Sequence, residues 1–224
     1  MFVKNAFFTN KDLVYRNWIQ NIKENNINYN EGYEVWDYFN KQELFNESIE
    51  LLEFWNGFQD NTSEEKLKIV FQLALLYEKT KQYENCKYYF YQVLDLIKQL
   101  KNEEYFEIYA NVSFRLGRLL FESNDINDYE TCLDLLYQAA DFAVKLYGEA
   151  SENTNIVFYT LGSALYSFGL LKQAYFYLKQ SGYYLEQLYG LNNTYVQEIY
   201  KKLLNLSKKM LKFNDYFKWK NKLL

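Results

Sequence analysis

Cysteine and histidine perform much of the chemistry at protein sites, so their number limits what this chain could do. The 224-residue sequence contains two cysteines, Cys86 and Cys132, and no histidine. Without histidine no His-based general base or catalytic triad can form, and most zinc sites are excluded as well. A thiol could still act as a nucleophile, so the position of each cysteine in the fold matters.

Two pairs of adjacent glutamates are the next candidates, because two carboxyl groups can share general acid and base work. Glu64-Glu65 and Glu103-Glu104 each stand at the expected beginning of a helix, where negative charge interacts favourably with the helix dipole. We therefore interpret both pairs as helix caps. A glycine-rich phosphate loop is missing, since Leu161 to Gly169 falls within a helical pattern. The sequence predicts a protein that is not an enzyme and binds no metal or cofactor.

The elements that position these residues are predicted to be helices. The sequence has no proline and eight glycines, too few turn residues for a protein of many short strands, although 49% of its residues are hydrophobic. The 24 tyrosines and 18 phenylalanines recur at helical spacing, as do Leu67, Val70, Phe71 and Ala74. We expect an all-α fold.

An internal repeat of about 42 residues organises the expected helices. Leu146-Tyr147-Gly148 recurs as Leu188-Tyr189-Gly190, 42 residues later. Two further sets of positions recur at similar spacing: Leu73-Ala74, Leu116-Gly117 and Leu161-Gly162, and then Cys86, Cys132, Ala174 and Tyr216. Both cysteines therefore occupy a position that requires a small packing residue, and we interpret them as core residues and not as nucleophiles.

The best copy of the repeat runs from Leu161 through Gly162 and Gly169 to Ala174. With its Leu-Gly step, second glycine and alanine in register, it resembles the tetratricopeptide repeat. The 42-residue period with Leu-Tyr-Gly between units is similar to the kinesin-light-chain type, although the usual His-Pro after that glycine is absent at both places. The resemblance implies a right-handed superhelical solenoid of antiparallel helical hairpins.

We expect an N-terminal helical segment over residues 1–28 and a repeat domain over residues 29–224. The expected hairpins cover residues 29–57, 63–100, 103–147, 152–189 and 194–224. No hairpin can cover its own apolar stripe, so neighbouring hairpins must stack to bury it. Thr62 to Glu65 and Asn127 to Glu130 are predicted capping boxes, and Gly148 and Gly190 are predicted left-handed helix stops.

In the tetratricopeptide family a concave groove is lined by the first helix of each hairpin, and the resemblance implies the same here. The corresponding residues are mostly aromatic or apolar: Phe71, Leu75, Glu78, Phe114, Arg118, Phe121, Tyr159, Ser163 and Tyr166. The Lys and Asn carboxylate clamp of chaperone-binding members is lacking, so a heat-shock chaperone tail is not the expected partner. An aromatic groove suits an amphipathic helix or an apolar peptide segment.

Two features of this groove leave alternatives open. Arg115 and Arg118, one turn apart, could anchor a partner carboxylate or could stabilise their own helix. The groove could also be filled by the chain's own N-terminal segment, which carries a helix-like apolar stripe: Phe7, Phe8, Leu13, Val14, Trp18 and Ile22.

Charge is distributed unevenly along the chain. Residues 24–65 contain eleven acidic residues and one lysine, whereas residues 201–224 contain eight lysines and one aspartate. The basic end, with lysines 208, 209, 218 and 220 among aromatic residues, could contact nucleic acid or an acidic membrane surface. We favour instead the solvated face of a helix that caps the solenoid, because a solenoid requires such a cap for solubility. The acidic sequence pI of about 5.1 argues against nucleic acid as the partner.

The sequence thus predicts a non-catalytic protein–protein interaction adaptor or scaffold subunit of a larger assembly, binding a helix or peptide segment in the groove. No apolar run is long enough for a membrane span, and we expect a cytoplasmic protein. A nucleic-acid-associated protein and a peptide-sensing bacterial regulator are the alternatives.

Overall fold

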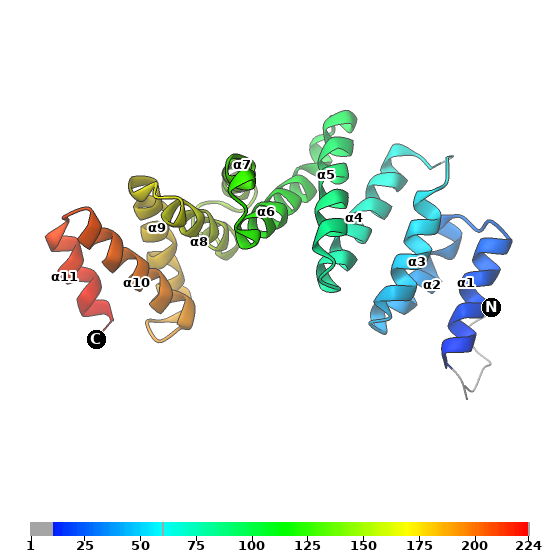
Figure 1. Ribbon diagram of the computed structural model, residues 1–224, viewed down its shortest axis with the longest axis horizontal. Coiled ribbons are helices and arrows are strands. Elements are labelled where there is room, and N and C mark those ends of the chain that lie inside the picture. The colour runs from blue at the N-terminus through cyan, green and yellow to red at the C-terminus, as the bar shows by residue number, and fades with distance from the viewer. Residues whose placement is uncertain (1–10, 60, 224) are drawn as a thin grey trace. The chain divides into compact units, whose positions relative to one another are not determined.

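The computed structural model describes residues 11–59 and 61–223, without the side chains of residues 11–15 and 31. These residues form α-helices joined by short turns, two of which contain a 3₁₀ helix, and they include no strand (Figure 1). The predicted all-α class is confirmed. The chain divides into two compact units, Met1–Lys101 and Asn102–Leu224.

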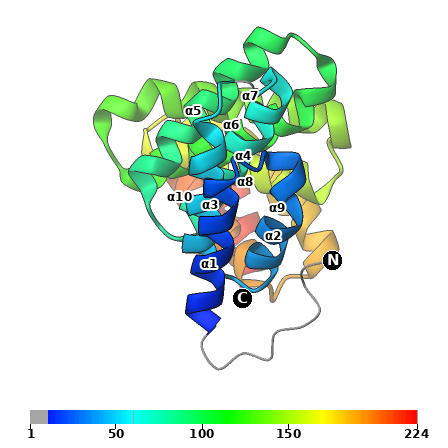
Figure 2. The ribbon, with the colours of Figure 1, turned by 90° about the vertical axis from the view of Figure 1, so that its right-hand side faces the viewer.

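The helices of the first unit are α1 (Lys11–Glu24), α2 (Tyr29–Lys41), α3 (Phe45–Asn56), α4 (Ser63–Lys79) and α5 (Tyr83–Leu100). Within this unit each helix from α2 onward packs on the next, and α1 packs on α3. Figure 2 shows α1, α2 and α3 nearest the viewer, with α1 lying alongside α3. Glu53 joins three helices, because its Oε1 accepts hydrogen bonds from the hydroxyls of Tyr77 at 2.8 Å and Tyr89 at 2.7 Å.

The second unit contains three hairpins in the same order of packing. Its helices are α6 (Phe106–Ser123), α7 (Tyr129–Tyr147), α8 (Glu152–Ser167), α9 (Leu171–Tyr189), α10 (Thr194–Lys209) and α11 (Phe213–Lys222). A 3₁₀ turn at Glu103–Tyr105 precedes α6, and another at Ile126–Asp128 precedes α7. The first helix of one hairpin also contacts the first helix of the next, as α6 does with α8.

Glycines allow the two helices of a hairpin to approach closely. A Cβ atom at Gly117 would lie 2.9 Å from Leu136 Cγ, and one at Gly162 would lie 2.8 Å from Leu178 Cγ. The glycine of each Leu-Gly step is therefore required for the close approach of the two helices of its hairpin. Cys86 and Cys132 are buried on α5 and α7, the second helices of their hairpins. Burial raises the pKa of the Cys132 thiol to about 12, so this side chain carries no thiolate at neutral pH.

One turn geometry recurs between the helices of four hairpins. In each, a residue with positive φ follows the first helix, and its N–H and the next N–H both bond back to carbonyls of the last turn. This is the Schellman arrangement. The residues with positive φ are Glu43, Lys81, Gly169 and Leu211.

Two predicted helix boundaries need correction. The capping box at Thr62 and Glu65 is confirmed, but Asn127 to Glu130 does not form one. Asp125 instead caps the 3₁₀ turn, its Oδ1 accepting from Asn127 N at 2.9 Å, because the extra turn separates the cap from α7. Gly148 has φ 78° and ψ 163°, so it continues in an extended conformation open essentially to glycine alone and is no left-handed helix stop. Gly190 behaves in the same way.

Candidate functional site

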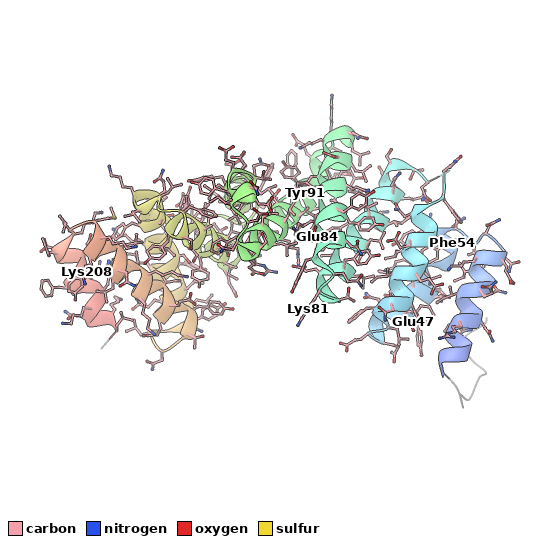
Figure 3. The ribbon with its side chains drawn as sticks, in the orientation of Figure 1. Glu47, Phe54, Lys81, Glu84, Tyr91 and Lys208 are labelled. Carbon is pink, nitrogen blue, oxygen red and sulfur yellow. The ribbon has the colours of Figure 1, made fainter. Side chains whose placement is uncertain are left out.

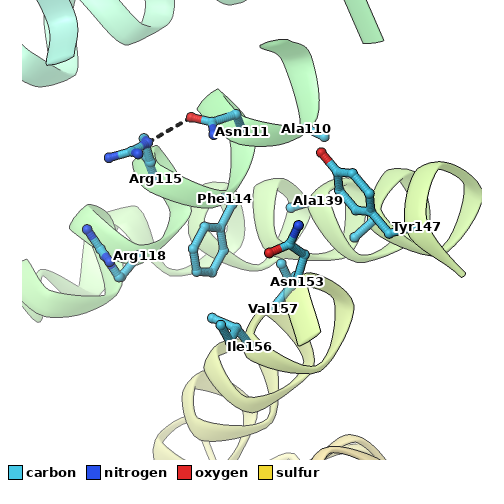
Figure 4. A pocket seen from close by; sticks show the side chains of 11 residues that line it. Ala110, Asn111, Phe114, Arg115, Arg118, Ala139, Tyr147, Asn153, Ile156 and Val157 are labelled. Carbon is cyan, nitrogen blue, oxygen red and sulfur yellow. Dashed lines mark hydrogen bonds between the residues drawn. The ribbon is translucent and has the colours of Figure 1, made fainter. Parts of the chain in front are cut away.

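A hollow of about 250 Å³ lies between α6, α7 and α8 of the second unit (Figure 4). Apolar side chains from all three helices form most of its lining: Ala110, Phe114, Ala139, Ala143, Ile156 and Val157. Polar side chains complete it: Asn111, Arg115, Arg118, Tyr147 and Asn153. The hollow therefore offers an apolar interior next to two guanidinium groups.

The hollow brings together three of the residues predicted from sequence, Phe114, Arg115 and Arg118. Figure 4 shows the Phe114 ring between the side chains of Arg118 and Asn153. Arg115 Nε donates to Asn111 Oδ1 at 2.7 Å. Arg118 lies over the Phe114 ring, 5.8 Å from its centroid, and its Nε is 3.7 Å from Glu122 Oε1. Both arginines thus make contacts within their own helix while they line the hollow.

The 42-residue register explains why this space stays open. The cap residues Ser151 and Asn193 align α8 with α10, which places Tyr195 where α8 has Asn153 and Lys202 where α8 has Thr160. Asn153 is too short to cross the hollow. Thr160 turns back to its own helix, with Oγ1 donating to Ile156 O at 3.1 Å. Small side chains at these two positions leave the space between α6 and α8 unfilled.

The corresponding space between α8 and α10 is crossed by Lys202. Its Nζ donates to Ser163 Oγ at 3.0 Å, to the Tyr159 hydroxyl at 3.3 Å and to Glu198 Oε1 at 2.7 Å. Tyr195 adds an edge-on ring contact with Tyr159, their centroids 6.1 Å apart. Tyr159 and Ser163 were predicted to face a partner, whereas the structure engages both with α10.

Electrostatics at this second space follow from the same contacts. The hydrogen bond from Lys202 holds the pKa of the Glu198 carboxyl below its usual value, although partial burial opposes this effect. Burial, helped by the nearby Glu198 carboxylate, raises the pKa of Tyr159 far above its ordinary value. At neutral pH the space therefore contains a lysine–glutamate ion pair and a neutral tyrosine.

The remaining predicted groove residues lie outside the hollow. The Phe121 ring contacts the Phe168 ring at 6.1 Å, and Lys209 lies over the Tyr166 ring at 5.0 Å. Phe71, Leu75 and Glu78 are half-buried residues of α4 in the first unit. Tyr147 was not predicted because it lies on the second helix of its hairpin. Asn153 and Ile156 lie on a first helix, but at positions other than those that the family resemblance implies. The signal lay in the contrast between Asn153 and Tyr195 in aligned repeats.

The N-terminal stripe is described only in part. Ile22 is buried, and the Trp18 ring packs against Tyr38 at 5.8 Å and Phe39 at 6.0 Å, on α2. These two side chains belong to the core of the first unit. Phe7 and Phe8, with the side chains of Leu13 and Val14, lie outside the described residues, so the self-filling alternative stays a prediction.

Several of the C-terminal lysines lie over tyrosine rings or pair with a carboxylate. Lys212 lies 4.1 Å from the Tyr175 ring centroid, Lys218 lies 4.8 Å from that of Tyr183, and Lys222 binds the Glu186 carboxylate at 2.5 Å. Trp219 is fully buried and stacks on Tyr200 at 5.4 Å. These contacts support the interpretation of α11 as a cap on the last hairpin.

Within residues 11–59 and 61–223, no cluster of three or more His, Cys, Asp or Glu side chains could hold a metal ion. None of the helices in this same part of the chain is both long and apolar enough to cross a bilayer.

Several solved structures have the same fold as this chain. BtubC (BKLC) from P. vanneervenii is 13% identical with a TM-score of 0.63, and the match covers 98% of this chain and 90% of that one. A Podosopora anserina protein with nearly identical TPR-like repeats, named for kinesin light chain, is 13% identical with a TM-score of 0.61, covering 87% and 92%. The chain thus has a tetratricopeptide-like helical repeat fold.

A third similar structure is a signal-transduction ATPase from Pyrococcus horikoshii with a tetratricopeptide repeat sensor. It is 12% identical with a TM-score of 0.59, and the match covers 95% of this chain and 31% of that one. No family model and no curated protein sequence matches the chain.

Proposed function

We propose that this chain is a non-catalytic protein-interaction module whose hollow between α6, α7 and α8 binds a segment of a partner protein. The observation that carries the proposal is the open space itself, lined by Phe114, Ile156 and Val157 beside Arg115 and Arg118. An apolar cavity beside cationic groups suits an apolar side chain that is adjacent to an acidic one. The fold supports the proposal, because stacked hairpins commonly present such surfaces.

The hollow is small, just below the range of about 300–1,000 Å³ that is usual for pockets that bind small molecules. A hollow of about 250 Å³ is suited to one or two side chains, with the rest of the segment lying along the surface. Ile156 is exposed at the edge of the hollow and extends the apolar surface outward.

The proposal can be tested with a displayed library of random peptides selected on the wild-type chain. We expect enriched sequences that share an apolar residue next to an acidic residue. Phe114→Ala should weaken the selected peptides by about 30-fold or more, the effect of losing a central aromatic contact at an interface. Phe121→Ala is the matched control, because it truncates the same residue type on the same helix outside the hollow.

Thermal unfolding followed by circular dichroism establishes that both variants remain folded. Enrichment of the same peptides by folded Phe114→Ala would contradict the assignment of the hollow. So would a selection that yields no shared sequence feature at all.

A further inference from the structure

The turn between α10 and α11 carries an exposed apolar surface that no part of the proposed function uses. Leu211, Phe213 and Phe217 are exposed by 71%, 67% and 58%. Lys208 and Lys220 flank them on α10 and α11, and both are exposed. Figure 3 labels Lys208 at this end of the second unit. We name these five residues the basic apolar tip.

Leu211 is unusual for the position that it occupies. It has φ 56°, a left-handed conformation that branched side chains rarely adopt. The three equivalent turns use Glu43, Lys81 and Gly169 there, which are two charged residues and a glycine. Only this turn presents a large apolar side chain to solvent, although a polar residue or a glycine would serve the turn equally well.

Helix α11 is amphipathic around this tip. Trp219 is buried on one side, where it stacks on Tyr200. Phe213, Phe217 and Lys220 are spaced at i, i+4 and i+7, so they lie along the opposite, exposed side. The two phenylalanines therefore do not contribute to the core that fixes α11 in place, and their exposure needs another reason.

The charges around the tip are mainly positive. Within the described part of the chain, Lys208 and Lys220 enter no ion pair. Lys212 stands in the turn itself, over the Tyr175 ring. One acidic residue of α11, Asp215, lies between the two phenylalanines and is half-buried, so lysines predominate around the tip.

The pattern argues against a further helical hairpin or a second copy of the chain as the occupant. Stacking hairpins bury an apolar stripe along the whole length of both helices. The exposed side of α10 is instead polar, with Lys201, Asn205 and Lys208 at successive turns, and the second half of α11 exposes Lys218 and Lys220. A short apolar tip ringed by lysines is suited to a flat surface that is apolar inside and negatively charged outside.

We propose that the basic apolar tip binds the surface of a lipid bilayer that carries anionic headgroups. Leu211, Phe213 and Phe217 insert at the boundary between headgroups and acyl chains, and Lys208, Lys212 and Lys220 contact the lipid phosphates and carboxylates. The chain then lies on the membrane by one end of its second unit, independently of the hollow between α6, α7 and α8.

The test is sedimentation of the full chain with vesicles of phosphatidylcholine alone or with about one third phosphatidylserine. We expect binding to the anionic vesicles only, weakening as salt is added. Phe213→Ser/Phe217→Ser should lower the partition coefficient at least about tenfold, because two aromatic side chains no longer insert. Lys208→Glu/Lys220→Glu should lower it at least about 25-fold, since each lysine near an anionic surface contributes about a factor of five.

Matched controls use exposed residues away from the tip. Phe176→Ser removes an exposed phenylalanine of α9, and Lys66→Glu/Lys98→Glu makes the same charge change on α4 and α5. Both should bind vesicles like the wild type. A Phe213→Trp variant adds a direct readout, because its emission should be quenched by brominated acyl chains of anionic vesicles.

Three results would overturn the proposal. The first is absence of vesicle binding by the wild type at low salt. The second is equal loss of binding in the control variants. The third is binding of RNA or DNA, or self-association in sedimentation velocity, that depends on Lys208 and Lys220 while vesicle binding does not.

Discussion

Two successive spaces in the second unit have the same helical framework and different contents. Between α6 and α8 lies a hollow of about 250 Å³, which Asn153 lines, and Thr160 bonds back to its own helix. Between α8 and α10 Lys202 reaches Tyr159 and Ser163. Helices α8 and α10 begin with alike caps at Ser151 and Asn193, so side chains at equivalent positions of these two helices contribute to the difference.

The comparison shows that a repeat fold does not by itself create a binding site. Each repeat supplies the same positions facing its neighbour, and a long side chain at one of them closes the space. Lys202 is kept in place by Glu198 at 2.7 Å and by the face of the Tyr159 ring at 4.8 Å. The site is therefore defined by residues that are short where the next repeat has long ones.

Exchanging these residues should have the largest effect. Asn153→Tyr/Thr160→Lys gives α8 the residues of α10 and should close the hollow, weakening selected peptides by about 30-fold or more. The reverse pair, Tyr195→Asn/Lys202→Thr, should leave peptide affinity unchanged because it alters only the second space. Fluorescence titration with a labelled peptide measures both. Equal affinity for the wild type and the first variant would show that the hollow is not the site.

Replacing a glycine of either hairpin by alanine should have a smaller effect, and the loss of stability should differ between the two sites. An alanine at Gly162 would place Cβ 3.1 Å from the Leu178 backbone nitrogen, whereas the nearest backbone atom at Gly117 is Cys132 O at 3.4 Å. Alanine gains about 1 kcal/mol in helix propensity, and overpacking costs about 1–3 kcal/mol. Gly162→Ala should therefore destabilise by about 1–2 kcal/mol and Gly117→Ala by less than about 1 kcal/mol. Urea unfolding measures the free energy of unfolding of both variants. A larger loss of stability for Gly117→Ala than for Gly162→Ala would refute the predicted order.

The smallest effect concerns the ion pair that closes the second space. The pKa of Glu198 is lowered in the folded state, so its contribution to stability is present above its unfolded pKa of about 4.3 and is lost as the pH falls through the lower folded pKa. Glu198→Gln should destabilise by less than about 1 kcal/mol at pH 7, because the pair is partly exposed.

Glu198→Gln should be as stable as the wild type in strongly acidic solution, because the protonated Glu198 side chain and the glutamine are both uncharged there. Urea midpoints across the acidic range measure this convergence. A difference that persists unchanged in acid would attribute the effect to packing of Glu198 and not to its charge.

Most of the fold could be predicted from the sequence because its signals are local. Hydrophobic spacing predicted helices, which the structure confirms, and the recurring Leu-Gly steps lie where Gly117 and Gly162 allow close packing. The cap at Asp125 was missed because a 3₁₀ turn intervenes before α7. The extended backbone of Gly148 was missed because positive φ alone does not fix ψ.

Only part of the candidate site could be predicted from the sequence. Phe114, Arg115 and Arg118 follow from the position of one helix in its hairpin. The absence of a covering side chain depends on two other helices, since Asn153 must be compared with Tyr195 and Thr160 with Lys202. Such a comparison needs the exact register of neighbouring repeats, which the structure supplies through the caps at Ser151 and Asn193.

Photocrosslinking from the bound peptide tests the central claim most directly. A peptide selected on the wild type carries p-benzoylphenylalanine beside its apolar residue, the unaltered chain is irradiated with it, and the crosslinked residues are located by mass spectrometry. We predict adducts on side chains that line the hollow, such as Ile156, and none on Tyr195, which stands at the position equivalent to Asn153. Adducts on Tyr195, or on both sides equally, would contradict a binding site confined to the hollow between α6, α7 and α8.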